Sequence, residues 1–92
     1  MFLDPRTWTK GEVVEWFKWA TDRYGVKDIT TDKFLMNGKG LCMLNLESFL
    51  YRVPQGGDLL YGDFQRRLHM ATQTTKALES YGVATSNFYF VY

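Results

Sequence analysis

The sequence has little of what catalytic or metal chemistry requires. Of its 92 residues, one is cysteine and one is histidine. A single cysteine cannot form an internal disulfide or a multi-cysteine zinc site. One cysteine and one histidine together also exclude most catalytic pairs of a nucleophile and a base. Cys42 lies in an apolar run, which is typical of a buried small side chain. We therefore predict that the chain is not an enzyme and needs no cofactor and no metal.

An excess of charge and a long apolar run are also lacking. Eleven Lys and Arg stand against ten Asp and Glu, for a net charge of +1. A surface that binds nucleic acid normally has a strong basic excess, and a membrane-spanning helix needs about 20 apolar residues. The one basic cluster, Arg66-Arg67 with His69, follows Asp58 and Asp63 and is interpreted as a solvated helix face. We predict no direct contact with nucleic acid or with a membrane.

Aromatic residues, in contrast, are abundant, with three Trp, six Tyr and seven Phe. Each large ring can bury roughly 150–250 Å², so most of them are expected in the core of a single small domain. The last residues, 87–92, are aromatic and uncharged. This tail could fold back on the core, form a strand-like segment or contact another chain.

A long first helix is predicted over residues 9–24. Thr9 and Glu12 have the spacing of a capping box, and Gly25 is a stop signal. The apolar residues between them recur at helical spacing. They are Val13, Trp16, Phe17, Ala20 and Tyr24.

Three short helical segments are predicted next. Thr30 or Thr31 can cap one or two turns that carry Phe34 inward, residues 39–44 form a second apolar segment, and Asn45 can cap a third with Phe49 and Leu50. The chain then turns at Pro54 and at residues 56–57.

A second long helix is predicted from Asp58, as its N-cap, to the region of Gly82. Its apolar stripe comprises Leu60, Phe64, Leu68, Ala71, Thr75 and Leu78. The fold class that follows is all-α, a small five-helix bundle in which two long helices flank three short ones.

Several motifs resemble the Pointed-type sterile alpha motif (SAM) domain of ETS-family transcription factors. They are the run 4–9 (DPRTWT) with Val13, Trp16 and Trp19-Ala20, the run 34–44 (FLMNGKGLCML), and Phe49, Arg52, Pro54, Gly57-Asp58, Leu60 and Tyr61. The resemblance covers about residues 4–70 and implies a five-helix domain over 4–82, followed by an aromatic tail over 83–92. The chain lacks an ETS DNA-binding domain, so it is either an excised domain or a SAM-bearing modulator. Because the tail is unlike a linker, we expect a chain terminus there and a likeness to the stand-alone (Mae-like) modulators of ETS activity.

SAM domains resemble one another in using two contact surfaces. By position in the motif, the mid-loop surface of this chain comprises Met36, Asn37, Lys39, Gly40, Met43, Asn45 and Glu47. The end-helix surface comprises Asp58, Leu59, Tyr61 and Gly62. Gly40 can be a helix-start glycine or a point of close approach for a partner, and both interpretations stay open. Leu59 is expected to be exposed, because its neighbour Leu60 lies on the core stripe. Gly62 and Asp63 weaken the helix and add a negative charge, so the end-helix surface is expected to be the poorer of the two.

The resemblance implies a module that binds the SAM domain of an ETS transcription factor heterotypically, blocks its head-to-tail self-association and so modulates transcription. The expected location is the nucleus, with the cytoplasm as a further compartment. Two alternatives stay open, a self-polymerising SAM scaffold and a docking platform for a mitogen-activated kinase pathway component. Neither proline follows a Ser or Thr, so the chain is not expected to be a proline-directed substrate itself.

Overall fold

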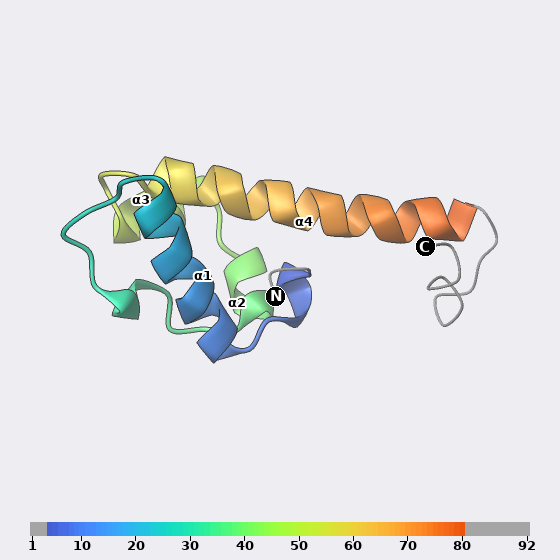
Figure 1. Ribbon diagram of the computed structural model, residues 1–92, viewed down its shortest axis with the longest axis horizontal. Coiled ribbons are helices and arrows are strands. Elements are labelled where there is room, and N and C mark those ends of the chain that lie inside the picture. The colour runs from blue at the N-terminus through green and yellow to red at the C-terminus, as the bar shows by residue number, and fades with distance from the viewer. Residues whose placement is uncertain (1–3, 81–92) are drawn as a thin grey trace.

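Six helical elements follow one another along residues 4–80, the part of the chain that this computed structural model describes (Figure 1). Two are short 3-10 turns and four are α-helices. In order they are η1 (Pro5–Thr7), α1 (Lys10–Arg23), η2 (Thr31–Phe34), α2 (Gly38–Cys42), α3 (Leu46–Arg52) and α4 (Gly57–Ser80). The all-α prediction is confirmed for this range, where α1 and α4 flank η2, α2 and α3. The turn η1 was not predicted. Four predictions lie outside what is described: Gly82 as the C′ residue of the last helix, the domain end at residue 82, the aromatic tail, and the side chains of Thr75 and Leu78.

The capping box at the start of α1 is confirmed. The backbone N–H of Glu12 donates to Thr9 Oγ1 at 3.2 Å, and the backbone N–H of Thr9 donates to Glu12 Oε1 at 2.9 Å. The helix ends before Gly25, whose φ of +66° lies in the left-handed region that glycine adopts without steric cost. The observed bounds, 10–23, therefore lie within one residue of the predicted ones.

The short elements depend on polar side chains at their starts. Asn37 Oδ1 accepts from the backbone N–H of Gly40 at 3.0 Å, and Asn45 Oδ1 accepts from that of Ser48 at 2.9 Å. Such caps satisfy backbone donors that a five- or seven-residue helix cannot satisfy internally. Of the two predicted caps of η2, Thr30 and not Thr31 takes the N-cap position, but its hydroxyl donates to the Asp32 carboxylate and makes no capping hydrogen bond to the backbone.

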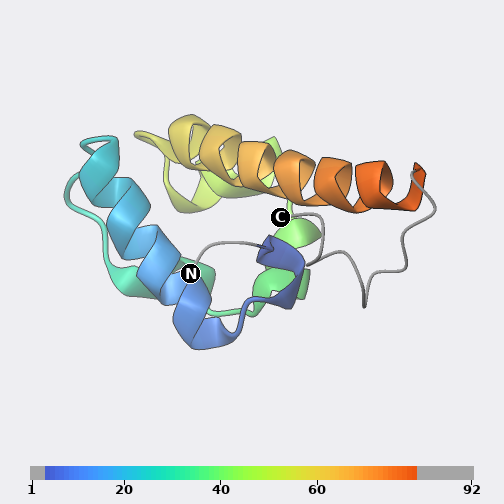
Figure 2. The ribbon, with the colours of Figure 1, turned by 45° about the vertical axis from the view of Figure 1, so that its right-hand side comes forward.

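The start of α4 corrects the prediction that Asp58 is its N-cap. The helix begins at Gly57, and the carbonyl of Gly56 accepts from the backbone N–H groups of Leu59 (3.0 Å) and Leu60 (3.2 Å). Gly57 packs so closely on α3 that an added Cβ would lie 2.6 Å from the carbonyl oxygen of Phe49. Two glycines thus bring the chain into the helix before Asp58, which lies in the first turn. The far end of α4 extends past the other helices (Figures 1 and 2).

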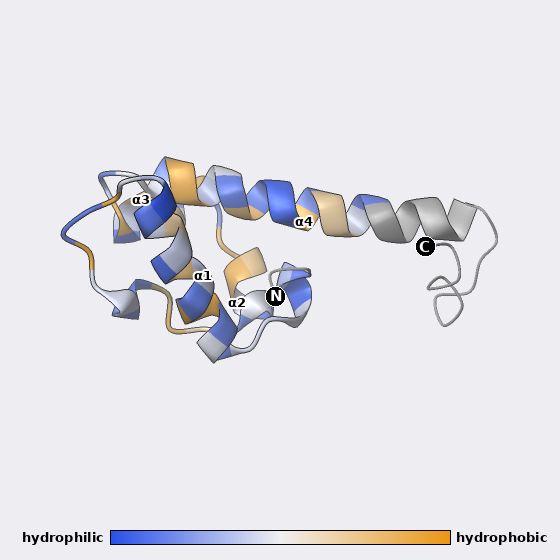
Figure 3. Cartoon of the chain, viewed as in Figure 1, coloured by the Kyte–Doolittle hydropathy of each residue, from blue (hydrophilic) through white to orange (hydrophobic). Residues whose placement is uncertain are grey.

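The core is a cluster of aromatic rings that joins both long helices to the short ones. The Trp16 and Phe64 centroids lie 5.7 Å apart, and those of Phe34 and Phe49 lie 4.8 Å apart. Figure 3 shows apolar residues alternating with hydrophilic ones around α1 and the first half of α4, as expected of helices with one buried face. The buried hydrophobic residues are Trp8, Val13, Trp16, Phe17, Ala20, Phe34, Leu41, Phe49, Val53, Leu60 and Phe64.

Candidate protein-interaction surfaces

The mid-loop residues lie at the starts of α2 and α3 and in the turns before them. Met36, Asn37, Lys39 and Gly40 form or precede the first turn of α2. Met43, Asn45 and Glu47 lie between α2 and the first turn of α3. All are exposed except Met36 and Gly40, which are half-buried. Met43 is the extreme case, with 86% of its surface exposed. This surface therefore presents an unburied apolar side chain among polar ones.

Asn37 and Asn45 hold these helices in shape. Each side-chain oxygen accepts the backbone N–H that it caps, and Asn45 Oδ1 also accepts from the Ser48 hydroxyl at 3.0 Å. Their contribution to a contact surface is thus partly indirect, because they fix where Gly40 and Glu47 lie.

Gly40 is close to side chains of its own chain. A Cβ built there would lie 3.1 Å from Met36 Cβ and 3.6 Å from Asn37 Oδ1. Any larger side chain at position 40 therefore has to displace Met36 or point outward into the space a partner would occupy. Its role in partner contact stays a prediction.

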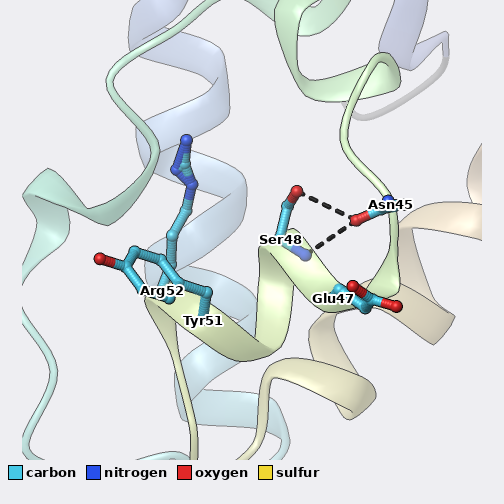
Figure 4. A pocket seen from close by; sticks show the side chains of 5 residues that line it. All are labelled: Asn45, Glu47, Ser48, Tyr51 and Arg52. Carbon is cyan, nitrogen blue, oxygen red and sulfur yellow. Dashed lines mark hydrogen bonds between the residues drawn. The ribbon is translucent and has the colours of Figure 1, made fainter.

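A hollow of about 380 Å³ lies along α3, and two mid-loop residues line it (Figure 4). Asn45 and Glu47 line it with three residues that sequence reasoning missed, Ser48, Tyr51 and Arg52. Tyr51 is 88% exposed. The available signal was spacing, because Glu47 and Tyr51 are four residues apart and so share one helix face.

The end-helix residues occupy the first two turns of α4. Asp58 is exposed, and Leu59 is 46% exposed while Leu60 is fully buried, as predicted. Tyr61 and Gly62 are half-buried. The Tyr61 ring packs edge-on against Phe49 at 5.2 Å, so much of this side chain belongs to the core. The outward part of this surface is consequently centred on Asp58 and Leu59.

Asp63 corrects the expectation that it adds negative charge to the end-helix surface. It is 5% exposed, and its carboxylate accepts from Trp16 Nε1 (2.8 Å), Tyr24 Oη (2.5 Å) and Arg67 Nε (2.7 Å). Burial alone raises the pKa of the Asp63 carboxyl, but Arg67, Tyr24 and Trp16 together outweigh it and the pKa is lowered. Asp63 is thus an internal link between α4 and α1. Its i,i+4 spacing to Arg67 was the local signal, whereas the contacts with α1 depend on the tertiary fold.

The described residues also bear on catalysis, metal binding and membrane crossing. Cys42 is half-buried, and burial raises the pKa of its thiol, which disfavours the nucleophilic thiolate. Among the side chains of residues 4–73, no three or more His, Cys, Asp or Glu gather where a metal ion could be held. Over the same range no helix combines the length and apolar character that a membrane crossing requires.

Comparison with known proteins gives consistent matches over most of the chain. A family model described as "Sterile alpha motif (SAM)/Pointed domain" matches residues 1–71. Transcription factor ETV6 of Mus musculus is 44% identical over 59 residues, which are 64% of this chain and 12% of that protein. Protein C-ets-1 of Rattus norvegicus is 42% identical over 59 residues, which are 63% of this chain and 13% of that protein. The chain thus matches only a small part of each of these curated relatives.

Proposed function

Because the chain belongs to the SAM/Pointed domain family, a family of protein-interaction modules and not of enzymes, we propose that it binds the SAM domain of an ETS transcription factor. The proposed contact is heterotypic and blocks the head-to-tail self-association of the partner, which modulates transcription. The relative ETV6 is named as a transcription factor, which supports action in the nucleus.

The observation that carries the proposal is the difference in exposure between the two surfaces. Met43 on the mid-loop surface is 86% exposed, whereas Leu59 on the end-helix surface is 46% exposed. Burial of apolar surface is the main favourable term in most protein association. A partner that covers Met43 can therefore bury a larger fraction of an apolar side chain than one that covers Leu59. The mid-loop surface of this chain accordingly meets the end-helix surface of the partner.

A module that uses one surface ends a filament and does not extend it. Head-to-tail contacts between SAM domains are heterologous, and they propagate only when every subunit offers both surfaces. To compete, this chain must bind the partner more tightly than the partner binds itself, at about 1.4 kcal/mol for each tenfold in affinity. Such an action corresponds to that of the stand-alone (Mae-like) modulators.

The test is a pair of substitutions in a titration against a polymer-competent ETS SAM domain. Gly40→Asp is expected to abolish binding, because it places a charged side chain in the centre of the mid-loop surface. Leu59→Arg is expected to leave binding largely intact. Gly40→Ala is the matched control for crowding against Met36, and circular dichroism verifies that each variant folds. Loss of binding with Leu59→Arg but not with Gly40→Asp would reverse the orientation.

One observation favours a second function, the self-polymerising scaffold, because Leu59 is exposed at the centre of the end-helix surface. Sedimentation of the isolated chain separates the two functions. A monomer at all concentrations supports the one-surface module. Species that grow with concentration, and that Leu59→Arg dissolves, would support the scaffold instead.

A further inference from the structure

A cluster of arginines and aromatic rings lies where the end of α1 meets the first half of α4, centred outside both predicted surfaces. We call it the cationic–aromatic face; it consists of Trp19, Arg23, Tyr24, Arg66 and Arg67. Figures 1 and 2 both show the C-terminal end of α1 beside this part of α4. We propose that this face binds an acidic peptide segment of a partner protein.

The five side chains are ordered by contacts with one another. The Arg67 guanidinium lies 4.7 Å from the centroid of the Trp19 ring, and the Arg23 guanidinium lies 5.6 Å from that of Tyr24. The two rings meet edge-on at 6.4 Å. Arg66 Nη2 donates to the Tyr24 hydroxyl at 2.9 Å. A surface held this way loses less side-chain entropy when a ligand binds.

The charges of Arg23 and Arg66 are largely uncompensated. The neighbouring carboxylate, Asp63, is buried, and its two oxygens already accept from Trp16, Tyr24 and Arg67. Arg66 reaches it only at 3.7 Å and keeps 65% of its side chain exposed. Arg23 is exposed, and among the side chains described, those of residues 4–73, no carboxylate lies within ion-pair distance of it. Two guanidinium groups, one over the Tyr24 ring and one at its hydroxyl, are therefore available to an anion.

Carboxylates of a peptide suit this arrangement better than the phosphates of a nucleic acid. The planar guanidinium matches a carboxylate in paired hydrogen bonds, and the 40% exposed Trp19 ring offers apolar area to the stems of Glu or to a neighbouring side chain. Nucleic-acid affinity depends on neutralising many phosphates, and this face offers few cations on a chain of net charge +1.

The test measures binding of a fluorescein-labelled oligoglutamate peptide to the full chain by anisotropy at low ionic strength, with oligoglutamine as the uncharged control. Saturable binding of oligoglutamate alone is expected, with a shift of the Trp19 indole N–H resonance.

The double variant Arg23→Gln/Arg66→Gln should weaken the binding of oligoglutamate by about tenfold or more. The matched control Lys10→Gln/Lys33→Gln removes the same charge outside this face and outside both predicted surfaces, and should change the affinity by less than about twofold. Arg23→Lys/Arg66→Lys keeps the charge but not the fork of donors, and should give an intermediate affinity.

Three outcomes would overturn the proposal. If the control that replaces two lysines by glutamine weakens binding as much as Arg23→Gln/Arg66→Gln does, net charge alone attracts the peptide. Tighter binding of a single-stranded oligonucleotide than of oligoglutamate would assign the face to nucleic acid. Loss of peptide binding with Leu59→Gln would assign it to the end-helix surface, which it borders at Gly62. Binding of the ETS SAM domain through the mid-loop surface is expected to be unaffected by Arg23→Gln/Arg66→Gln, so the two functions fail independently.

Discussion

The mid-loop and end-helix surfaces are built in different ways although they belong to one small domain. The mid-loop surface lies on two helices of five and seven residues, which asparagine caps hold at their starts. The end-helix surface lies on the first turns of a 24-residue helix, which Asp63 ties to α1 from within. Met43, in the turn between the two short helices, is therefore more exposed than Leu59 in the first turn of the long one.

The largest expected effect concerns the glycines that lie beneath each surface. A Cβ at Gly38 would lie 1.7 Å from the carbonyl oxygen of Pro5, and one at Gly57 would lie 2.6 Å from that of Phe49. Gly38→Ala and Gly57→Ala should each lower the free energy of unfolding by about 3 kcal/mol or more, measured by urea denaturation.

Their controls are Gly62, where an added Cβ has room, and Gly40, where it would meet the side chain of Met36 at 3.1 Å and not a backbone atom. Gly62→Ala should raise stability by up to about 1 kcal/mol, because its Cβ would meet only Arg66 Nη1 at an ordinary 3.6 Å. Gly40→Ala should stay within about 1 kcal/mol of wild type. Equal effects at positions 38 and 40 would contradict the packing described for α2.

A smaller effect is expected from the link beneath the end-helix surface. Asp63→Asn removes the charge that Arg67 pairs with and should cost about 2 kcal/mol near neutral pH. The pKa of the Asp63 carboxyl is lowered in the folded chain, so its stabilisation is present above the unfolded value of about 4 and is lost as the pH falls through the folded value. The stability difference between wild type and Asp63→Asn should therefore shrink below about pH 4. A difference independent of pH would mean that the carboxylate charge does not stabilise the fold.

The smallest effects on stability are expected at the exposed apolar side chains themselves. Met43→Ser and Leu59→Ser should each change the free energy of unfolding by less than about 0.5 kcal/mol, because both sites face solvent. Their effects on binding to an ETS SAM domain should differ, with a loss of about tenfold for Met43→Ser and little change for Leu59→Ser. Equal losses in a titration would mean that both surfaces take part.

The sequence predicted the elements whose signals are local. The capping box of Thr9 and Glu12, the stop at Gly25 and the cap at Asn45 each involve residues within one or two turns, and each appears in the structure. The N-cap of α4 was predicted two residues too late, at Asp58 instead of Gly56, because the start of this helix depends on how Gly57 packs against α3 and not on a capping side chain.

The surfaces were predictable only in part, because some of their residues are placed by contacts between distant elements. The exposure of Leu59 followed from its place beside the core residue Leu60. The burial of Asp63 did not follow, because its partners Trp16 and Tyr24 are 47 and 39 residues away and reach it only once α1 lies against α4. Tyr51, in contrast, was missed although a local signal existed, because it lies four residues after Glu47 in the same helix.

The Asp63 link also constrains how this sequence can change over generations. The Asp63 carboxylate accepts hydrogen bonds from Trp16, Tyr24 and Arg67. A substitution of the acid therefore removes the shared acceptor of three donors at once, whereas a substitution of one donor leaves the other two hydrogen bonds in place. Descendants of this chain should therefore tolerate drift at a single donor but replace the acid only after, or together with, its partners. The interior of the α1–α4 contact should therefore change slowly and in a fixed order. The exposed residues around Met43 carry no such constraint from the fold and can change together with the partner that they contact.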